Sequence, residues 1–197
     1  MGVSLLHISA PPHMLAHDLT VLRAMAAELP DYLLSGVLFW QMQAGSGVPK
    51  LSLGAMLLTR ARLAAAGPQL TAAQQAELDL TSRDLEAELV RWPAAAENKA
   101  AQELRSRVNL WQAFLRDCQE SPDACTDNYS HEVNQRVLAA LLLRRFPRLA
   151  DSPEARRLAP LDVQLRRRLK TGAFILPAEF QAGFPQSEFW FLYGQIG

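Results

Sequence analysis

Apolar residues recur at alternating spacings of three and four between residues 101 and 118. This spacing is typical of the buried positions of a heptad repeat, so it predicts a long amphipathic helix. The positions are Ala101, Leu104, Val108, Trp111, Leu115 and Cys118.

A sparser stripe precedes that helix, at Leu78, Leu85, Leu89 and Trp92, with Thr81 or Ser82 filling one position. Two helices with apolar stripes bury little surface alone, so other elements are expected to dock along them. The pattern therefore predicts a helical hairpin over residues 71–118. It is expected to fold at Trp92 and Pro93.

Further amphipathic segments predict helices near residues 15–29, 52–67, 127–145 and 153–171, the last with an expected break at Pro160. The first should end before Pro30, because proline disfavours a helical conformation of the residue before it. Residues 32–43 are apolar on nearly all sides. They are compatible with either a buried helix or a buried strand.

Together these segments predict an all-α fold, a multi-helix bundle of about six or seven helices around the long antiparallel hairpin. The 197 residues fit a single domain with a sizeable core. At most a minor β pair is expected, formed by residues 3–8 and 174–176.

The C-terminal segment, residues 173–197, loses helical periodicity and carries seven of the fifteen aromatic residues. A segment this aromatic is expected to be ordered. We expect most of its aromatic side chains to fix the tail to the core and one or two to contact a protein partner or a second copy. The candidate partner-binding residues are Phe184, Phe189, Trp190, Phe191 and Tyr193.

Charge and hydropathy exclude several functional classes. Twenty basic and twenty acidic residues balance, with no basic stripe, so no nucleic-acid partner is expected. The only basic run, residues 166–170, is interpreted as a solvated helix end. The longest apolar stretch, residues 33–40, is too short to span a membrane, and residues 1–13 make a poor signal peptide. A cytoplasmic location is therefore expected.

Two cysteines, Cys118 and Cys125, flank a predicted turn. A bridge closing this turn is geometrically feasible, but two free thiols in a reducing cytosol are the favoured interpretation.

The candidate metal ligands are His13 and His17, four residues apart, with Asp18 beside them. His131 and Glu132 could complete a site. However, the leucine stripe of this helix lies on roughly the opposite face from the histidines, whereas metal sites in bundles are built in the core. We therefore expect a solvent-exposed pair, no metal and no cofactor.

No catalytic residues are predicted. His131 with Cys118 or Cys125 lacks the strand–turn–helix elbow and the oxyanion hole that such a nucleophile needs. The sequence therefore favours a non-catalytic helical interaction or assembly protein that docks a protein partner or its own copy. The alternative is a helical metal- or small-molecule-binding protein or enzyme with a pocket between helices.

Overall fold

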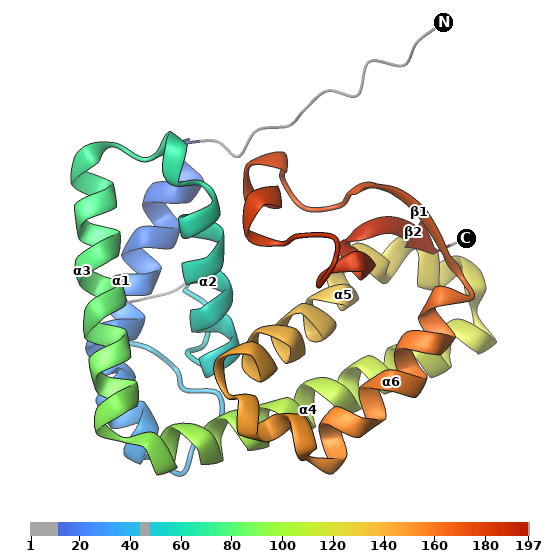
Figure 1. Ribbon diagram of the computed structural model, residues 1–197, viewed down its shortest axis with the longest axis horizontal. Helices are drawn as coiled ribbons and strands as arrows, with labels where there is room; N and C mark the ends of the chain where they lie inside the picture. Colours follow the sequence, from blue (N-terminus) through green and yellow to red (C-terminus); the bar gives the residue numbers. More distant parts are fainter. Residues whose placement is uncertain (1–11, 44–47, 197) are drawn as a thin grey trace, which may run out of the picture.

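The computed structural model describes residues 12–43 and 48–196, with the backbone alone for residues 12, 13 and 122–124. These residues form six α-helices, four short 3-10 helices and one two-stranded sheet (Figure 1). The predicted all-α class with a minor β pair is confirmed. The α-helices are α1 (Pro12–Leu34), α2 (Leu53–Ala65), α3 (Ala72–Arg91), α4 (Pro93–Glu120), α5 (Pro122–Arg145) and α6 (Pro153–Arg166). The strands are β1 (Leu169–Phe174) and β2 (Tyr193–Ile196), and the 3-10 helices are η1 (Gly67–Gln69), η2 (Pro147–Asp151), η3 (Ala178–Gly183) and η4 (Trp190–Leu192).

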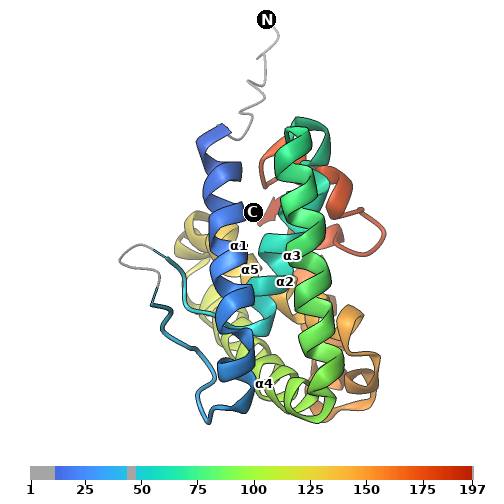
Figure 2. The same cartoon turned by 90° about the vertical axis from the view of Figure 1, so that its left-hand side faces the viewer.

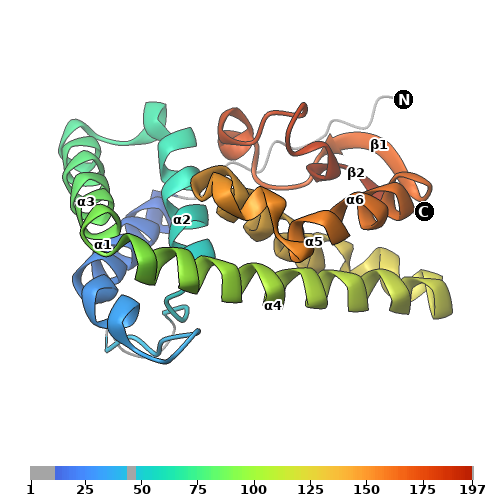
Figure 3. The same ribbon diagram turned by 60° about the horizontal axis from the view of Figure 1, so that its bottom comes forward.

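Helices α1, α2 and α3 lie side by side, and α4 crosses below their lower ends in the view of Figure 1 (Figures 1 and 2). Helix α4 extends to the other end of the molecule, and α5 and α6 pack along it (Figure 3). The aromatic tail then covers α5. Helix α2 contacts α1, α4, α5 and η3, so it joins the two halves of the core.

The predicted hairpin over residues 71–118 is wrong in its packing. Its two helices and their junction at Trp92 are correct, but α3 packs on α1 while α4 turns away and packs on α5 and α6 (Figure 1). Trp92 has a non-helical backbone and Pro93 begins the next helix, so the chain changes direction there. The closely packed antiparallel hairpin is formed by α4 and α5 instead, and it turns at Ser121.

Helix α1 does not end before Pro30 but continues for one more turn, to Leu34. This extra turn buries Tyr32 and Leu33. The free energy gained by burying them offsets the loss of the backbone hydrogen bond that Pro30 cannot make. Both alternatives considered for residues 32–43 are therefore wrong over most of the segment. Beyond Leu34, the described part of this segment is irregular, and it is tied down by an isolated bridge between Trp40 and Leu51.

Three other features of the predicted helices are also wrong. Helix α6 ends at Arg166 rather than near residue 171, and Leu169 and Lys170 of the basic run belong to strand β1 instead of a helix end. Helix α5 begins at Pro122, five residues before the predicted Asp127, with proline at a position where it is tolerated. Helix α6 runs through Pro160 without a break, because Leu158, Leu161 and Leu165 bury one face across the proline.

Strand β1 pairs antiparallel with β2. The predicted contribution of residues 3–8 to a β pair falls outside the described residues. The pairing is interrupted by a bulge between Thr171 and Phe174. Gly194 has φ +158°, and a Cβ atom at this position would lie 2.3 Å from the carbonyl oxygen of Lys170. Only glycine allows this close approach of the two strands.

The apolar stripe of α4 lies in the core as predicted, except that Ala101 is exposed and Ala100 takes its place. Trp111 is fully buried and stacks on Phe114, with 5.5 Å between the ring centres. On α3, Leu78, Leu85 and Leu89 are buried.

Candidate functional site

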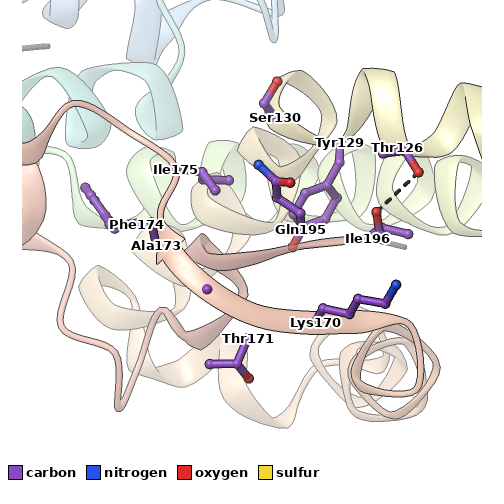
Figure 4. Close-up of a pocket in the computed structure, with 11 residues that line it drawn as sticks. Thr126, Tyr129, Ser130, Lys170, Thr171, Ala173, Phe174, Ile175, Gln195 and Ile196 are labelled. Carbon is purple, nitrogen blue, oxygen red and sulfur yellow. Dashed lines mark hydrogen bonds between the residues drawn. The ribbon is translucent and has the colours of Figure 1, made fainter. Parts of the chain in front are cut away.

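A groove of about 750 Å³ lies between α5 and the two-stranded sheet (Figure 4). One wall is formed by α5 and the other by β1 and the end of β2. The residues that line it are Thr126, Tyr129, Ser130, Lys170, Thr171, Gly172, Ala173, Phe174, Ile175, Gln195 and Ile196.

Two side chains of α5 hold β2 and the preceding η4 in place behind this groove. The Thr126 hydroxyl donates to the carbonyl oxygen of Ile196 at 3.2 Å, as Figure 4 shows. The Tyr129 hydroxyl donates to the carbonyl oxygen of Phe191 at 2.6 Å, and burial raises the pKa of this phenol. Both hydroxyls use main-chain acceptors, so they fix the backbone of this segment against α5.

The chemistry of the groove suits binding. Among the described residues that line it, Lys170 is the one charged side chain, and there is no histidine, cysteine or carboxylate. The described lining therefore lacks the imidazole, thiol and carboxylate groups that most often serve as nucleophile or general base. The polar groups of Ser130 and Gln195 lie beside the apolar side chain of Ile175, so both kinds of surface are offered (Figure 4).

Strand β1 gives this groove its main distinguishing feature. It is paired with β2 along one edge, and within the described residues no strand pairs with its other edge. Residues 170–173 are all exposed. An unpaired strand edge presents backbone N–H and C=O groups that another extended chain can bind.

The predicted partner-binding aromatics divide into buried and half-buried residues. Phe184, Phe189 and Phe191 are fully buried and Tyr193 is nearly so, which fixes the tail to the core. Their side chains are therefore unavailable to a partner on the described surface. Trp190 alone is half-buried, and its contact with a partner stays a prediction.

The predicted metal candidates do not form a cluster. Asp18 is buried and forms an ion pair with Arg62 at 2.9 Å, while His17 is exposed. Burial raises the pKa of Asp18, although the charges of Arg62 and His17 oppose the shift. The side chain of His13 lies outside the described residues. Among the residues that the structure describes, no group of three or more potential ligands could hold a metal ion.

The interpretation of Cys118 and Cys125 as free thiols is wrong, because the structure joins them in a disulfide. The bridge ties the end of α4 to the start of α5, across the turn at Ser121. The physical reason is the early start of α5, which brings the two Cα atoms to 4.9 Å, within the range that a disulfide spans. His131 is exposed.

Sequence reasoning missed a buried polar network around Glu103. This carboxylate is 0% exposed and accepts from the Ser52 hydroxyl at 2.7 Å and from the Gly54 backbone N–H at 2.8 Å. Arg107, one turn later on α4, donates to it at 2.8 Å and also reaches Gln135. Glu103 thus supplements the predicted cap, Ser52, at the start of α2 and anchors that helix to α4.

Lys99 is a second buried charge on α4, with 4% of its surface exposed. Its ammonium donates to the carbonyl oxygen of Val37 and to the Ser35 hydroxyl, and it lies 4.6 Å from the centre of the Tyr32 ring. Burial lowers its pKa. These contacts hold the irregular segment after α1 against α4, so we interpret Lys99 as structural.

Comparison of the chain with protein-family models, with curated proteins and with solved structures found no match.

Proposed function

We propose that the protein is a non-catalytic interaction protein and that a protein partner docks at the groove between α5 and β1. The observation that carries this proposal is that β1 has an edge with which no strand pairs within the described residues, and that residues 170–174 of this strand line the groove. An extended segment of the partner would add to this edge as a third strand, with its main chain supplying affinity and its side chains contacting Ile175 and Ser130. Lys170 favours a partner segment with an acidic side chain.

The test is photo-cross-linking in the cells from which the sequence comes. A photoreactive amino acid replaces Ser130, which is exposed in the groove, and a control protein carries it at Leu80, which is exposed on α3. The expected result is a discrete protein adduct from position 130 that is absent from position 80. An adduct of twice the chain mass would identify a second copy as the partner.

The decisive variant is Ala173→Pro. Ala173 lies in the bulge between the paired residues Thr171 and Phe174, so proline removes one backbone N–H from β1 at a position where it is tolerated. The adduct should be lost in this variant while its melting temperature is kept. Equal adducts from positions 130 and 80, or an adduct that survives Ala173→Pro, would reject the proposal.

The cellular compartment of the protein is also part of this proposal. No helix in the described ranges is both long and apolar enough to cross a membrane. The cytoplasmic location expected from the sequence stays a prediction, and the Cys118–Cys125 bridge favours an oxidising compartment, where disulfides persist. Alkylation of thiols at the moment of cell lysis distinguishes the two, because free thiols are expected only in a reducing compartment.

A further inference from the structure

A second groove, of about 590 Å³, lies between the C-terminal part of α4 and the N-terminal part of α5. Its floor is apolar and is formed by Leu110, Ala113, Phe114 and the Cys118–Cys125 disulfide. Leu110 keeps 46% of its surface exposed, so part of this apolar floor is open to solvent.

This groove lies on the free flank of the α4–α5 hairpin. On α4, Asn109 and Gln112 face α6, because both accept hydrogen bonds from Arg157. Leu110 and Ala113 follow each of them by one residue, about 100° further around the helix, so they point away from α6. Helix α6 therefore covers one flank of the hairpin, and the groove marks the other.

The rim of the groove is acidic. Asp117, Glu120 and Glu132 line it, and no lysine or arginine is among its described lining residues. Asp117 has one surface ion pair, with Arg116 at 3.6 Å. For Glu120 and Glu132 there is no ion-pair partner anywhere in the described chain. An apolar floor with unpaired carboxylates beside it is complementary to a surface that is apolar in the middle and basic at its edges.

The walls of this groove favour a helix as the occupant. Both walls are helices whose backbone groups bond within the helix, so they offer no open edge of the kind that β1 presents. A helix brings its own satisfied backbone and can lay an apolar stripe between the ridges of α4 and α5. The distance along α4 from Leu110 to Cys118 is about 12 Å, enough for about two turns of such a helix.

We infer that the groove at the disulfide end of the α4–α5 hairpin binds an amphipathic helix of a protein partner, with lysines or arginines beside its apolar stripe. This site is separate from the groove at β1, and neither depends on the other. The bridge between Cys118 and Cys125 serves it by fixing the floor.

The test uses a labelled probe peptide of about 14 residues with a leucine stripe flanked by lysines, and a matched peptide with glutamate at every lysine. Fluorescence anisotropy at about 0.15 M salt measures their binding to the full chain. We expect saturable binding of the basic peptide, at least about tenfold tighter than that of the acidic one. Leu110→Ser should weaken it at least about tenfold, whereas Leu80→Ser, the same change at an exposed leucine of α3, should not.

Reversing the charge of two rim carboxylates provides a second test of the same inference. The double variant Glu120→Lys with Glu132→Lys should reverse the preference between the two peptides, and melting curves confirm that it is folded. Equal binding of both peptides, or equal affinity in the Leu110→Ser and Leu80→Ser variants, would overturn the inference. Ala173→Pro should leave this binding unchanged, so failure here and failure at β1 are distinguishable.

Discussion

Arg166 lies over the ring of Trp190, with 3.6 Å between the guanidinium carbon and the ring centre. This contact covers the one predicted partner-binding aromatic that is only half-buried, whereas the neighbouring Phe189 is fully buried. Trp190→Ala should therefore lower the free energy of unfolding by about 1–2 kcal/mol, since it loses a cation–π contact and part of its apolar burial. Phe189→Ala should cost about 3–5 kcal/mol. Equal losses in chemical denaturation would contradict this division of the tail.

Trp111 is the largest side chain in the core, and its indole Nε1 has no hydrogen-bond partner in the described structure. Trp111→Ala should cost about 3–5 kcal/mol, as large-to-small core changes do. Trp111→Phe keeps most of the ring volume and removes the unpaired donor, so it should cost less than about 1.5 kcal/mol. Denaturant titration of both variants checks the order, and an alanine variant within about 0.5 kcal/mol of wild type would show that this face is not core.

Glu103 anchors the start of α2 to α4, so its loss should leave buried partners unpaired. Glu103→Ala removes the acceptor used by Gly54 and Arg107, and we expect a loss of about 3–5 kcal/mol. Glu97 lies on the same helix in an exposed ion pair with Arg148, so Glu97→Ala should cost no more than about 1 kcal/mol. Similar melting temperatures for the two variants would refute the anchoring role.

The disulfide predicts a thiol count and a response to reductant. Unfolded, unreduced protein should show no free thiol, and two per chain after reduction, because both cysteines are bridged. Reduction should lower the free energy of unfolding by about 2–3 kcal/mol, the value expected for so short a loop. The double variant Cys118→Ala with Cys125→Ala serves as control, since its stability should not respond to the reductant. Two free thiols in the untreated protein would exclude the bridge.

Glu86 predicts a dependence of stability on pH. Burial alone would raise the pKa of this carboxyl, but hydrogen bonds from Arg60 and Arg145 outweigh it and hold the pKa below its ordinary value of 4.5. Because the folded state favours the ionised form, its stabilisation is present above pH 4.5 and is lost as the pH falls through the lower, folded-state pKa. Glu86→Gln should therefore cost up to about 1 kcal/mol at neutral pH, and this difference from wild type should vanish in acid. A difference that stays constant from pH 7 to about pH 3 would contradict the shift.

Sequence periodicity predicted the helices because it reports which face of each one is buried. It did not predict which helix covers that face. The stripe containing Leu104 and Trp111 is equally compatible with α3 or α5 as neighbour, and the choice depends on the change of direction at Trp92 and the early start of α5. Both prolines were expected to interrupt a helix, but Pro30 and Pro160 lie within helices whose buried leucines outweigh one missing hydrogen bond.

The candidate sites were harder to predict, because they depend on contacts between distant segments. Strand β1 has no alternating pattern, and its partner is the four-residue strand β2, more than 20 residues later. The sequence of α4 does not indicate that Glu103 is buried, because two of its hydrogen-bond donors, Ser52 and Gly54, come from a distant segment. The aromatic tail was identified correctly as an ordered element, yet which of its rings remained accessible depended on the position of Arg166.

The C-terminal segment that ends in β2 also has a consequence for synthesis of the chain. Residues 189–196 supply Phe189, Phe191 and Ile196 to the core over α5, and they are made after every helix they cover. Chains generally begin to fold from the N-terminal side during translation. The apolar face of α5 must therefore stay uncovered on the ribosome until these residues emerge, and in that interval a chaperone that binds exposed apolar surface has its best opportunity to hold the nascent chain.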